Sequence, residues 1–446
     1  MPRDSLDTLK TDPAVSTATI TPRLLSGGER SIVLFAALAG WVIAGIHMGS
    51  TTLVAKPAVN SMLQKPTEEV LAQWVSWYNF GILCGAAVGG IIFGWMGDRF
   101  GRTKAMAASV LCYSAFAAIA FYARTPEELL LWRFLTGLGI GGLWPNAVTL
   151  VSEAWPNSQR PLISGIVGTG ATAGIGIISW ITMSHAVTPE NWRWLLLWSS
   201  TPVVLGIFTL LAVPESPRWV AKQQMRRLNL GGVGGEKTNN VSLTTAFRPP
   251  LLRYTLIGIV LASVAIVGGW GSNWFVHWAE QVGVANANYG FKSQVLLVRS
   301  GTGVIGTLFG AVLASRFGRR KMYFFMCVTS LVTSVYVFKW LTPMSPHFLI
   351  WVGVVGFFAT MFFGWLPFYM PELFPLTARA TGTGASFNIA RGLTALAFLS
   401  TGTYMSQFAK DQTPYANLGV FMSSIYILGM IAIFFAPDTT KKQLED

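Results

Sequence analysis

The sequence is poor in charged residues, and this scarcity argues against a water-soluble fold. Only 11% of the 446 residues are charged, against about 25% in a typical soluble protein. Cysteine is also scarce: all three fall inside apolar stretches, which leaves no disulfide framework and no cysteine metal set. The first 30 residues lack the apolar core of a secretory signal and are expected to form a polar cytosolic tail.

Long apolar stretches stand where the charge is missing. A helix of about 20 residues crosses the hydrocarbon core of a bilayer, and lipid leaves no water for bare backbone groups, so each stretch should be a helix. Six stretches precede a polar segment and six follow it. The expected spans are 31–53, 74–93, 105–122, 129–151, 164–183 and 194–213, then 254–275, 294–314, 322–338, 348–370, 381–404 and 415–435.

Two motifs recur at nearly the same interval, which indicates an internal duplication. The pattern R-F-G-R-x-K starts at Arg99 and again at Arg316, and the pattern E-x-x-P-x-x-x-R starts at Glu153 and again at Glu372. Unlike motifs that repeat in the same order indicate two related halves. We therefore predict an all-α membrane protein with twelve transmembrane helices in two pseudo-symmetric six-helix halves.

The basic residues predict the orientation of this bundle. Twenty-two of the 32 Lys and Arg residues fall on the side of the termini and only seven on the other side. Because cytosolic loops are enriched in Lys and Arg, both termini should lie in the cytosol, as in a multi-pass plasma or bacterial inner membrane protein. The expected parts are a tail at 1–30, a half at 31–213, a cytosolic linker at 214–253, a half at 254–436 and a cytosolic tail at 437–446.

The block from Asp98 to Arg102 follows the second span, and its echo follows the eighth. This arrangement resembles the major facilitator superfamily, and the resemblance implies a transporter that works by alternating access, without a cofactor and not an enzyme. Pro214-Glu-Ser-Pro-Arg-Trp219 resembles the group of sugar porters, organic ion transporters and metabolite–proton symporters. Sugar porters usually carry a double glutamine that Gly268–Trp278 lacks, so organic-acid symporters are the closer likeness. Their D-G-[FY]-D motif corresponds to Ala44–His47, where both acids are absent.

Charges at the expected cytosolic helix ends are predicted to gate transport. Charge-assisted bonds there would hold the halves together and break when the protein opens inward. For Arg319 and Arg320 we expect only the ordinary enrichment of basic residues on the cytosolic side. Arg133 resembles a helix-four motif with a structural or coupling role, and its spacing places it near the outer rim. The predicted latch residues are Asp98, Arg102, Glu153, Arg160, Glu372 and Arg379.

Arginine in the middle of a span is the main pointer to the substrate. None of the 19 acidic residues falls in the middle of an expected span, and an unpaired charge there costs at least about 2.5–3.5 kcal/mol. We predict that Arg391, with Asn388 one turn before it, holds a carboxylate, the alternative being bonds to backbone or water. Arg299 is a second anion contact or outer gate, or else its side chain extends to the membrane surface.

His47 is the one deep side chain that titrates near neutrality, so it is the candidate proton carrier or else a polar wall of the cavity. Trp278 is expected in the outer aromatic belt. Aromatic and amide groups would frame the body of the substrate, with ordinary packing as the alternative. These predicted framing residues are Trp270, Asn273, Trp274, Trp365 and Tyr78.

The sequence thus predicts a secondary transporter of a small organic anion, with protons as the candidate coupling ion. A carrier of sugar or another neutral metabolite is the alternative, and a non-transporting sensor with this fold is a weaker one. No glycine–lysine loop of an ATP-driven pump is present. The expected partners are the small anion, protons and the lipid bilayer, with no metal and no nucleic acid, and the chain should act as a monomer.

Overall fold

The computed structural model describes residues 25–64, 66–155, 160–227, 247–375, 378–408 and 414–439. Within these ranges the chain is helical and forms no strand. The first half contains α1 (Gly27–Leu63), α2 (Glu68–Phe100), α3 (Arg102–Ala120), α4 (Pro126–Ala154), α5 (Arg160–Ser184), α6 (Arg193–Ser200) and α7 (Val203–Ala212). After α8 (Pro217–Arg227), the second half contains α9 (Leu252–Gly271), α10 (Trp274–Ala285), α11 (Phe291–Phe317), α12 (Arg319–Trp340), α13 (Phe348–Tyr369), the 3-10 turn η4 (Met370–Leu373), α14 (Arg379–Phe408), α15 (Pro414–Ser423), α16 (Ile425–Ala432) and the 3-10 turn η6 (Ile433–Phe435).

The predicted fold class is confirmed. Among the described residues, eleven helical stretches are long and apolar enough to cross a membrane. The remaining span, the eleventh in chain order, is α14, which is not in that set and carries polar residues, Arg391 among them. Spans six, seven and twelve are each built from two helices in series: α6 with α7, α9 with α10, and α15 with α16.

Some span ends differ from the prediction. Helix α1 continues to Leu63, and the seventh span continues through α10 to Ala285. Helix α11 begins at Phe291, before the expected start of the eighth span. As a result, Lys56, Glu280 and Lys292, which the sequence places in loops, are buried within helices. Hydropathy alone ends a span at its first charges, whereas charges that pair with each other can stay inside the bundle. The glycine-rich patch of the predicted linker lies outside the described residues.

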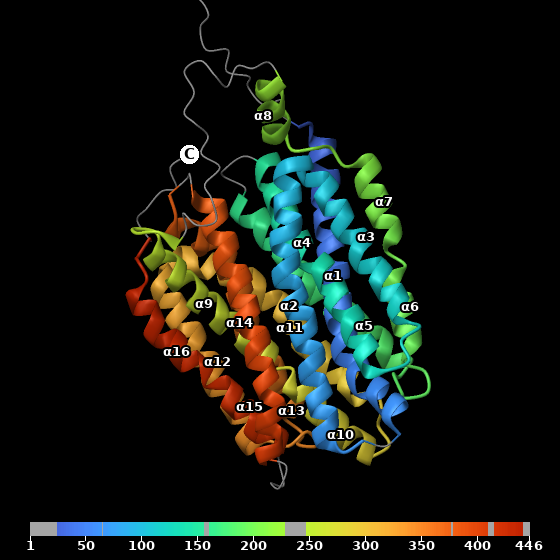
Figure 1. Cartoon of the computed structure of the whole chain (residues 1–446). Coiled ribbons are helices and arrows are strands. Elements are labelled where there is room, and N and C mark those ends of the chain that lie inside the picture. Colours follow the sequence, from blue (N-terminus) through green and yellow to red (C-terminus); the bar gives the residue numbers. More distant parts are fainter. Residues whose placement is uncertain are drawn as a thin grey trace, which may run out of the picture.

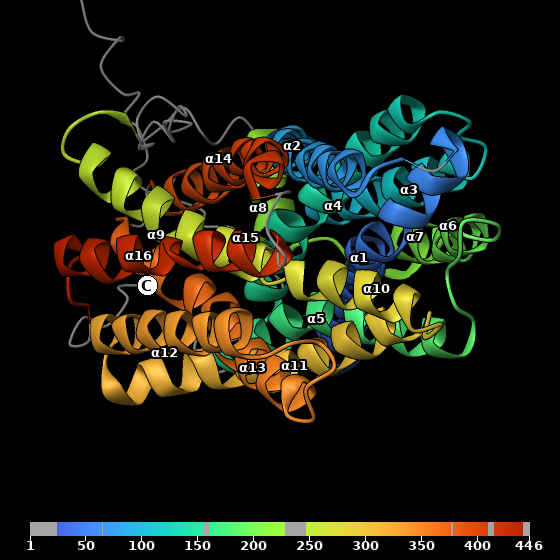
Figure 2. The ribbon, with the colours of Figure 1, turned by 90° about the horizontal axis from the view of Figure 1, so that it is seen from below.

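The two halves stand side by side, and their main contacts are α2 against α14 and α5 against α11 (Figure 1). We call the end that carries Gly94–Lys104 and α8 the basic end, and the other end the opposite end (seen in Figure 2). In the described part of the chain, the hydrogen bonds that join the halves lie toward the opposite end. Examples are Ser76 with Thr401 at 2.7 Å and Thr182 with Ser293 at 2.9 Å.

The repeated R-F-G-R block forms the same turn in both halves. Gly101 and Gly318 adopt φ angles of 114° and 93°, a region that favours glycine. Each glycine ends one helix and begins the next, α2 to α3 and α11 to α12. In the first half the carboxylate of Glu215 accepts a hydrogen bond at 2.8 Å from the backbone N–H of Arg102 and so caps α3. The duplicated motif is therefore a duplicated turn between helices.

Candidate functional site

Arg391 occupies the middle of α14 and is only 6% exposed. Its guanidinium lies over the ring of Phe387, with Cζ 4.6 Å from the ring centre. Its Nη1 is buried and has no hydrogen-bond partner, and no described carboxylate lies within ion-pair distance. A buried cation in this state has lost its water without gaining a counter-charge. This orphaned group is the strongest indication of an anion site.

Asn388 lies one turn closer to the basic end than Arg391 and faces the other half. A Cβ added to Gly90 of α2 would lie 2.3 Å from Asn388 Oδ1, so the amide packs directly against that glycine. The face of α14 that carries Asn388 therefore lies on the boundary between the halves, where Arg391 follows at i+3. This is where carriers with two repeats bind substrate.

A second unpaired cation lies in the first half. Arg133 of α4 is 1% exposed, and neither of its terminal nitrogens has a partner. His47 of α1 and Tyr78 of α2 are within its electrostatic reach. Both imidazole nitrogens of His47 and the hydroxyl of Tyr78 are likewise buried without partners. The ring of His47 packs against that of Tyr113 at 5.0 Å. The cluster is polar, positively charged and unsatisfied.

Helix contacts show that Arg133 is deep, not near the outer rim as its spacing predicts. Gly85 in the middle of α2 packs against the backbone of Phe134, the residue after Arg133. Because Gly90 of the same helix packs against Asn388, Arg133 and Arg391 differ in depth by no more than about two turns, or roughly 11 Å. The spacing misleads because it is counted from Glu153, the second-last residue of α4, and so measures the distance to the helix end and not to the membrane surface.

Arg299 supports the break in the seventh span. Its Nε donates to the hydroxyl of Ser272 at 2.8 Å, and its Nη2 donates to the carbonyl of Gly269. Gly269 lies in the last turn of α9 and Ser272 caps that helix, where the backbone carbonyls lose their helical partners. Arg299 is 6% exposed, so it does not extend to the membrane surface. Its bonds give it a positioning role at the break, beside Asn273, whose Oδ1 is buried and unpaired.

The residues of the predicted aromatic frame lie in separate regions of the bundle. Trp270 contacts Phe398 of α14 with ring centres 6.4 Å apart, on the helix that carries Arg391. Trp274 is buried against Tyr415 toward the opposite end. Trp365 lies elsewhere, where its indole N–H donates to the carbonyl of Arg319 at 3.1 Å, so its contacts are those of a packing residue. The belt position predicted for Trp278 is wrong, because the side chain is 5% exposed and packs inside the second half.

At the basic end, Glu372 pairs with Arg319. The guanidinium makes two hydrogen bonds to the carboxylate, of 2.9 and 3.2 Å, and both side chains are buried. The hydroxyl of Thr439 donates to the same carboxylate. The sequence predicts Arg379, from the same motif as Glu372, as a latch residue and expects Arg319 only from the enrichment of basic residues on the cytosolic side. The Nε of Arg379 is buried without a partner. The prediction for Arg319 is therefore wrong.

The first half has a related arrangement. Glu153 accepts a hydrogen bond from Ser216, the residue before α8. Asp98 is paired with Arg102 at 2.5 Å, but its side chain is 70% exposed. Among the described residues, neither acid is bonded to the other half. The side chain of Arg160 lies outside the described residues.

A third repeated motif contacts Glu153 in the first half and Glu372 in the second, and the sequence analysis does not identify it. Pro214-Glu-Ser216 in the first half corresponds to Pro437-Asp-Thr439 in the second, and in each case the hydroxyl donates to the repeated glutamate. A search for conservative replacements, Glu to Asp and Ser to Thr, at intervals a few residues longer than those of the other repeats would have found it. The echo shows that the duplication includes the segments that follow each half.

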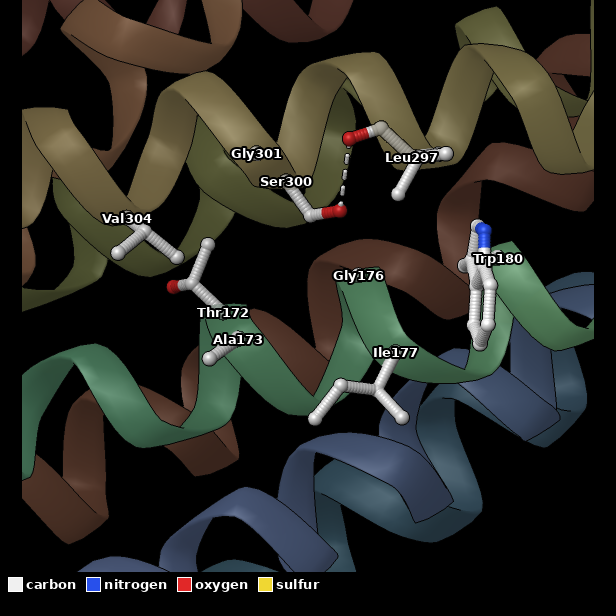
Figure 3. Close-up of a pocket in the computed structure, with 9 residues that line it drawn as sticks. All are labelled: Thr172, Ala173, Gly176, Ile177, Trp180, Leu297, Ser300, Gly301 and Val304. Carbon is white, nitrogen blue, oxygen red and sulfur yellow. Dashed lines mark hydrogen bonds between the residues drawn. The ribbon is translucent and has the colours of Figure 1, made fainter.

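A groove between α5 and α11 is unrelated to these residues. It has a volume of about 300 Å³ and is lined by small and apolar side chains with the hydroxyls of Thr172 and Ser300 (Figure 3). Trp180 at its edge is 67% exposed, so the groove opens on the outer surface of the bundle. None of the predicted substrate residues lines it.

The duplicated bundle, its broken seventh span and its buried unpaired arginines are those of a membrane carrier. The family model of the Major Facilitator Superfamily matches residues 31–398, and the chain belongs to that superfamily. The protein is thus a multi-pass membrane transporter and not an enzyme.

Curated relatives are carriers of metabolites. The chain is 27% identical to a putative metabolite transport protein of Haemophilus influenzae, over 81% of this chain and 86% of that protein. It is 27% identical to a cis,cis-muconate transport protein of Acinetobacter baylyi, over 72% and 77%. An arabinose-proton symporter of Bacillus subtilis is 28% identical over 69% and 72%. The xylose transporter XylE of E. coli, in a partially occluded inward-open conformation, shares the fold with a TM-score of 0.69, at 16% identity over 92% and 99%.

Proposed function

We propose that the protein is a secondary carrier of a small organic anion, with Arg391 as the group that binds the substrate carboxylate. The observation that carries this proposal is the buried guanidinium without a counter-charge. A carboxylate bound there would restore the electrostatic balance through a charge-assisted, two-pronged hydrogen bond. Asn388 would add a neutral donor, and Phe387 and Trp270 would bound the organic part of the substrate.

The relatives support this substrate class without deciding it. A muconate carrier handles a carboxylate by its name, whereas the arabinose-proton symporter handles a neutral sugar. A sugar carrier is therefore the second candidate. The two differ in what Arg391 would do: in a sugar carrier it would need a partner from the protein, and the described residues supply none within ion-pair distance.

We further propose that the basic end faces the cytosol, because basic residues concentrate there. The structure is joined at the opposite end by hydrogen bonds between the halves. With this orientation, it would represent a state closed to the outside. Alternating access then requires those bonds to break and the halves to approach each other at the basic end, where Asp98, Glu153 and Glu372 would act as gates.

The test of the substrate site is the variant Arg391→Gln in proteoliposomes. We expect saturable carboxylate uptake to be lost, because a neutral amide cannot balance the charge, while the purified protein keeps its helical content and melting behaviour. Arg124→Gln, at an exposed position, is the matched control and should transport normally. Normal carboxylate uptake by Arg391→Gln would refute the proposed role.

Coupling to protons is proposed for His47. Protonation would place a second positive charge beside Arg133, so it is favoured only when an anion is close to the pair. This would make proton binding and anion binding cooperative. We expect His47→Gln to retain exchange of substrate across the membrane but to lose accumulation of substrate driven by an imposed pH gradient. If the variant responds to the pH gradient as the parent protein does, His47 does not carry the coupled proton.

A further inference from the structure

Five ionisable side chains form one network at the opposite end, and none of them belongs to the predicted site. Lys56 of α1 and Lys292 of α11 are buried, each with a carboxylate close by. The Nζ of Lys56 lies 2.8 Å from Glu68, and that of Lys292 lies 2.6 Å from Glu280. The fifth member is Tyr415 of α15, whose hydroxyl donates to Glu68 at 2.8 Å.

Each half uses its own lysine to bind the other half. Lys56, in the first half, lies over the ring of Tyr415 in the second, 4.6 Å from its centre. Lys292, in the second half, donates to the carbonyls of Leu53 at 3.1 Å and Val187 at 3.3 Å, both in the first. These reciprocal contacts cross the boundary that must separate when the opposite end opens. The network therefore has the position and the bonds of a latch.

Glu280 is the member of this network with a carboxylate oxygen that accepts no hydrogen bond and could bind a proton. Its Oε1 faces Lys292, whereas its Oε2 is buried without a hydrogen-bond partner and lies 3.7 Å from the Nδ1 of His277, which also has no hydrogen-bond partner. The charged groups around it are Lys292 on α11, His277 on its own helix and, farther off, Lys56 on α1. A proton on Oε2 could be donated to His277 after a small approach of the two side chains.

We propose that Glu280 is a proton-binding site that controls the latch at the opposite end. As a carboxylate, it balances the buried charge of Lys292 and lets that lysine bind the carbonyls of the first half. Protonation removes the balance and leaves Lys292 as a buried unpaired cation, a state that opening to water relieves. A low pH on that side therefore favours the open form. The proposal concerns the conformational cycle and holds for any substrate.

The test measures the separation of the halves by electron spin resonance. Spin labels are placed at Glu69 and Ala285, exposed positions at the opposite end of the two halves, in the full chain with its native cysteines replaced. At neutral pH the parent should show one short distance, and a longer population should grow as the pH falls. Glu280→Gln, which imitates the protonated side chain, should show the longer population as the majority at every pH.

Two further variants keep the test decisive. His277→Gln should retain the pH response, because it leaves the carboxylate in place. If His277→Gln loses the pH response while Glu280→Gln retains it, the proton binds to the histidine and the proposal is overturned. The double variant Glu280→Gln/Lys292→Met removes both buried charges, so it should fold even if the single variant does not, and its distances should not change with pH. A distance distribution in Glu280→Gln identical to that of the parent would also overturn the proposal.

Discussion

At the scale of single residues, burial decides which charges matter. Glu372 and Arg319 are buried and doubly hydrogen-bonded, whereas the pair of Asp98 and Arg102 is largely exposed on its acidic side. Breaking a buried pair leaves an uncompensated charge, which costs about 3–5 kcal/mol. An exposed pair contributes only about 0–1 kcal/mol. The Glu372–Arg319 and Asp98–Arg102 pairs therefore differ in their effect on stability, although each pair includes a residue of the repeated R-F-G-R-x-K motif.

This difference gives a prediction for variants that remove one partner. Glu372→Ala should lower the melting temperature of the detergent-solubilised protein strongly, because Arg319 stays buried without its carboxylate. Asp98→Ala, the matched control, should melt close to the parent. Thermal unfolding followed by the intrinsic fluorescence of the 18 tryptophans measures both. Equal melting temperatures for the two variants would contradict the account of the buried pair.

The candidate site could be predicted only in part at this scale. Arg391 and His47 stand out because a charged or titratable group inside an apolar span is unusual in any sequence. The partner of Glu372 does not stand out, because Arg319 approaches it only after α12 and α13 have packed together. The buried lysines of the opposite end were missed for the same reason, since they resemble loop residues until their carboxylates are placed beside them.

At the scale of helices, glycine sets how closely two spans approach. A Cβ added to Gly141 of α4 would lie 1.9 Å from the carbonyl oxygen of Ala86 in α2. A Cβ added to Gly301 of α11 would meet nothing within 4 Å. The glycine-rich stretches of α4 and α11 look alike in the sequence, yet only some of their members lie at a helix contact.

The two positions form a matched pair of substitutions. Gly141→Ala should separate α2 from α4 and lower the melting temperature, because backbone atoms would have to move. Gly301→Ala should be neutral or stabilise the protein by about 0.5–1 kcal/mol, the usual gain from replacing glycine inside a helix. Thermal unfolding in detergent compares them directly. A stability loss in Gly301→Ala as large as that in Gly141→Ala would show that the close helix contact at Gly141 does not set the effect.

The spans themselves were predictable because hydropathy and the length of a bilayer crossing fix them. Their breaks were not. Residues Ser272 and Asn273 separate α9 from α10, and the carbonyl freed there is satisfied by Arg299 from a different span. Such compensation depends on packing between helices, which the local sequence does not record. The Gly268-Gly269 pair marks the region of the break but does not locate it.

At the scale of the whole molecule, the duplication supplies two halves whose contacts at one end define the state of the carrier. Ser76 and Thr401 are joined by a hydrogen bond across the boundary at 2.7 Å. A disulfide at these positions should hold the opposite end closed and stop transport, because the halves could no longer separate there.

We expect the variant Ser76→Cys/Thr401→Cys, with the native cysteines replaced, to lose uptake on oxidation and to regain it on reduction. The single variant Ser76→Cys should be indifferent to the oxidant. Uptake into proteoliposomes before and after reduction is the measurement. Undiminished transport by protein that is fully cross-linked would rule out the separation of the halves at this contact.

The most direct test of the central claim is uptake by the unmodified protein in proteoliposomes. A panel of labelled carboxylates and neutral sugars is offered with and without an imposed pH gradient, and each is used as competitor for the others. The account predicts saturable entry of a carboxylate that other carboxylates inhibit and sugars do not. Saturable entry of a neutral sugar, with no carboxylate taken up or competing, would contradict it.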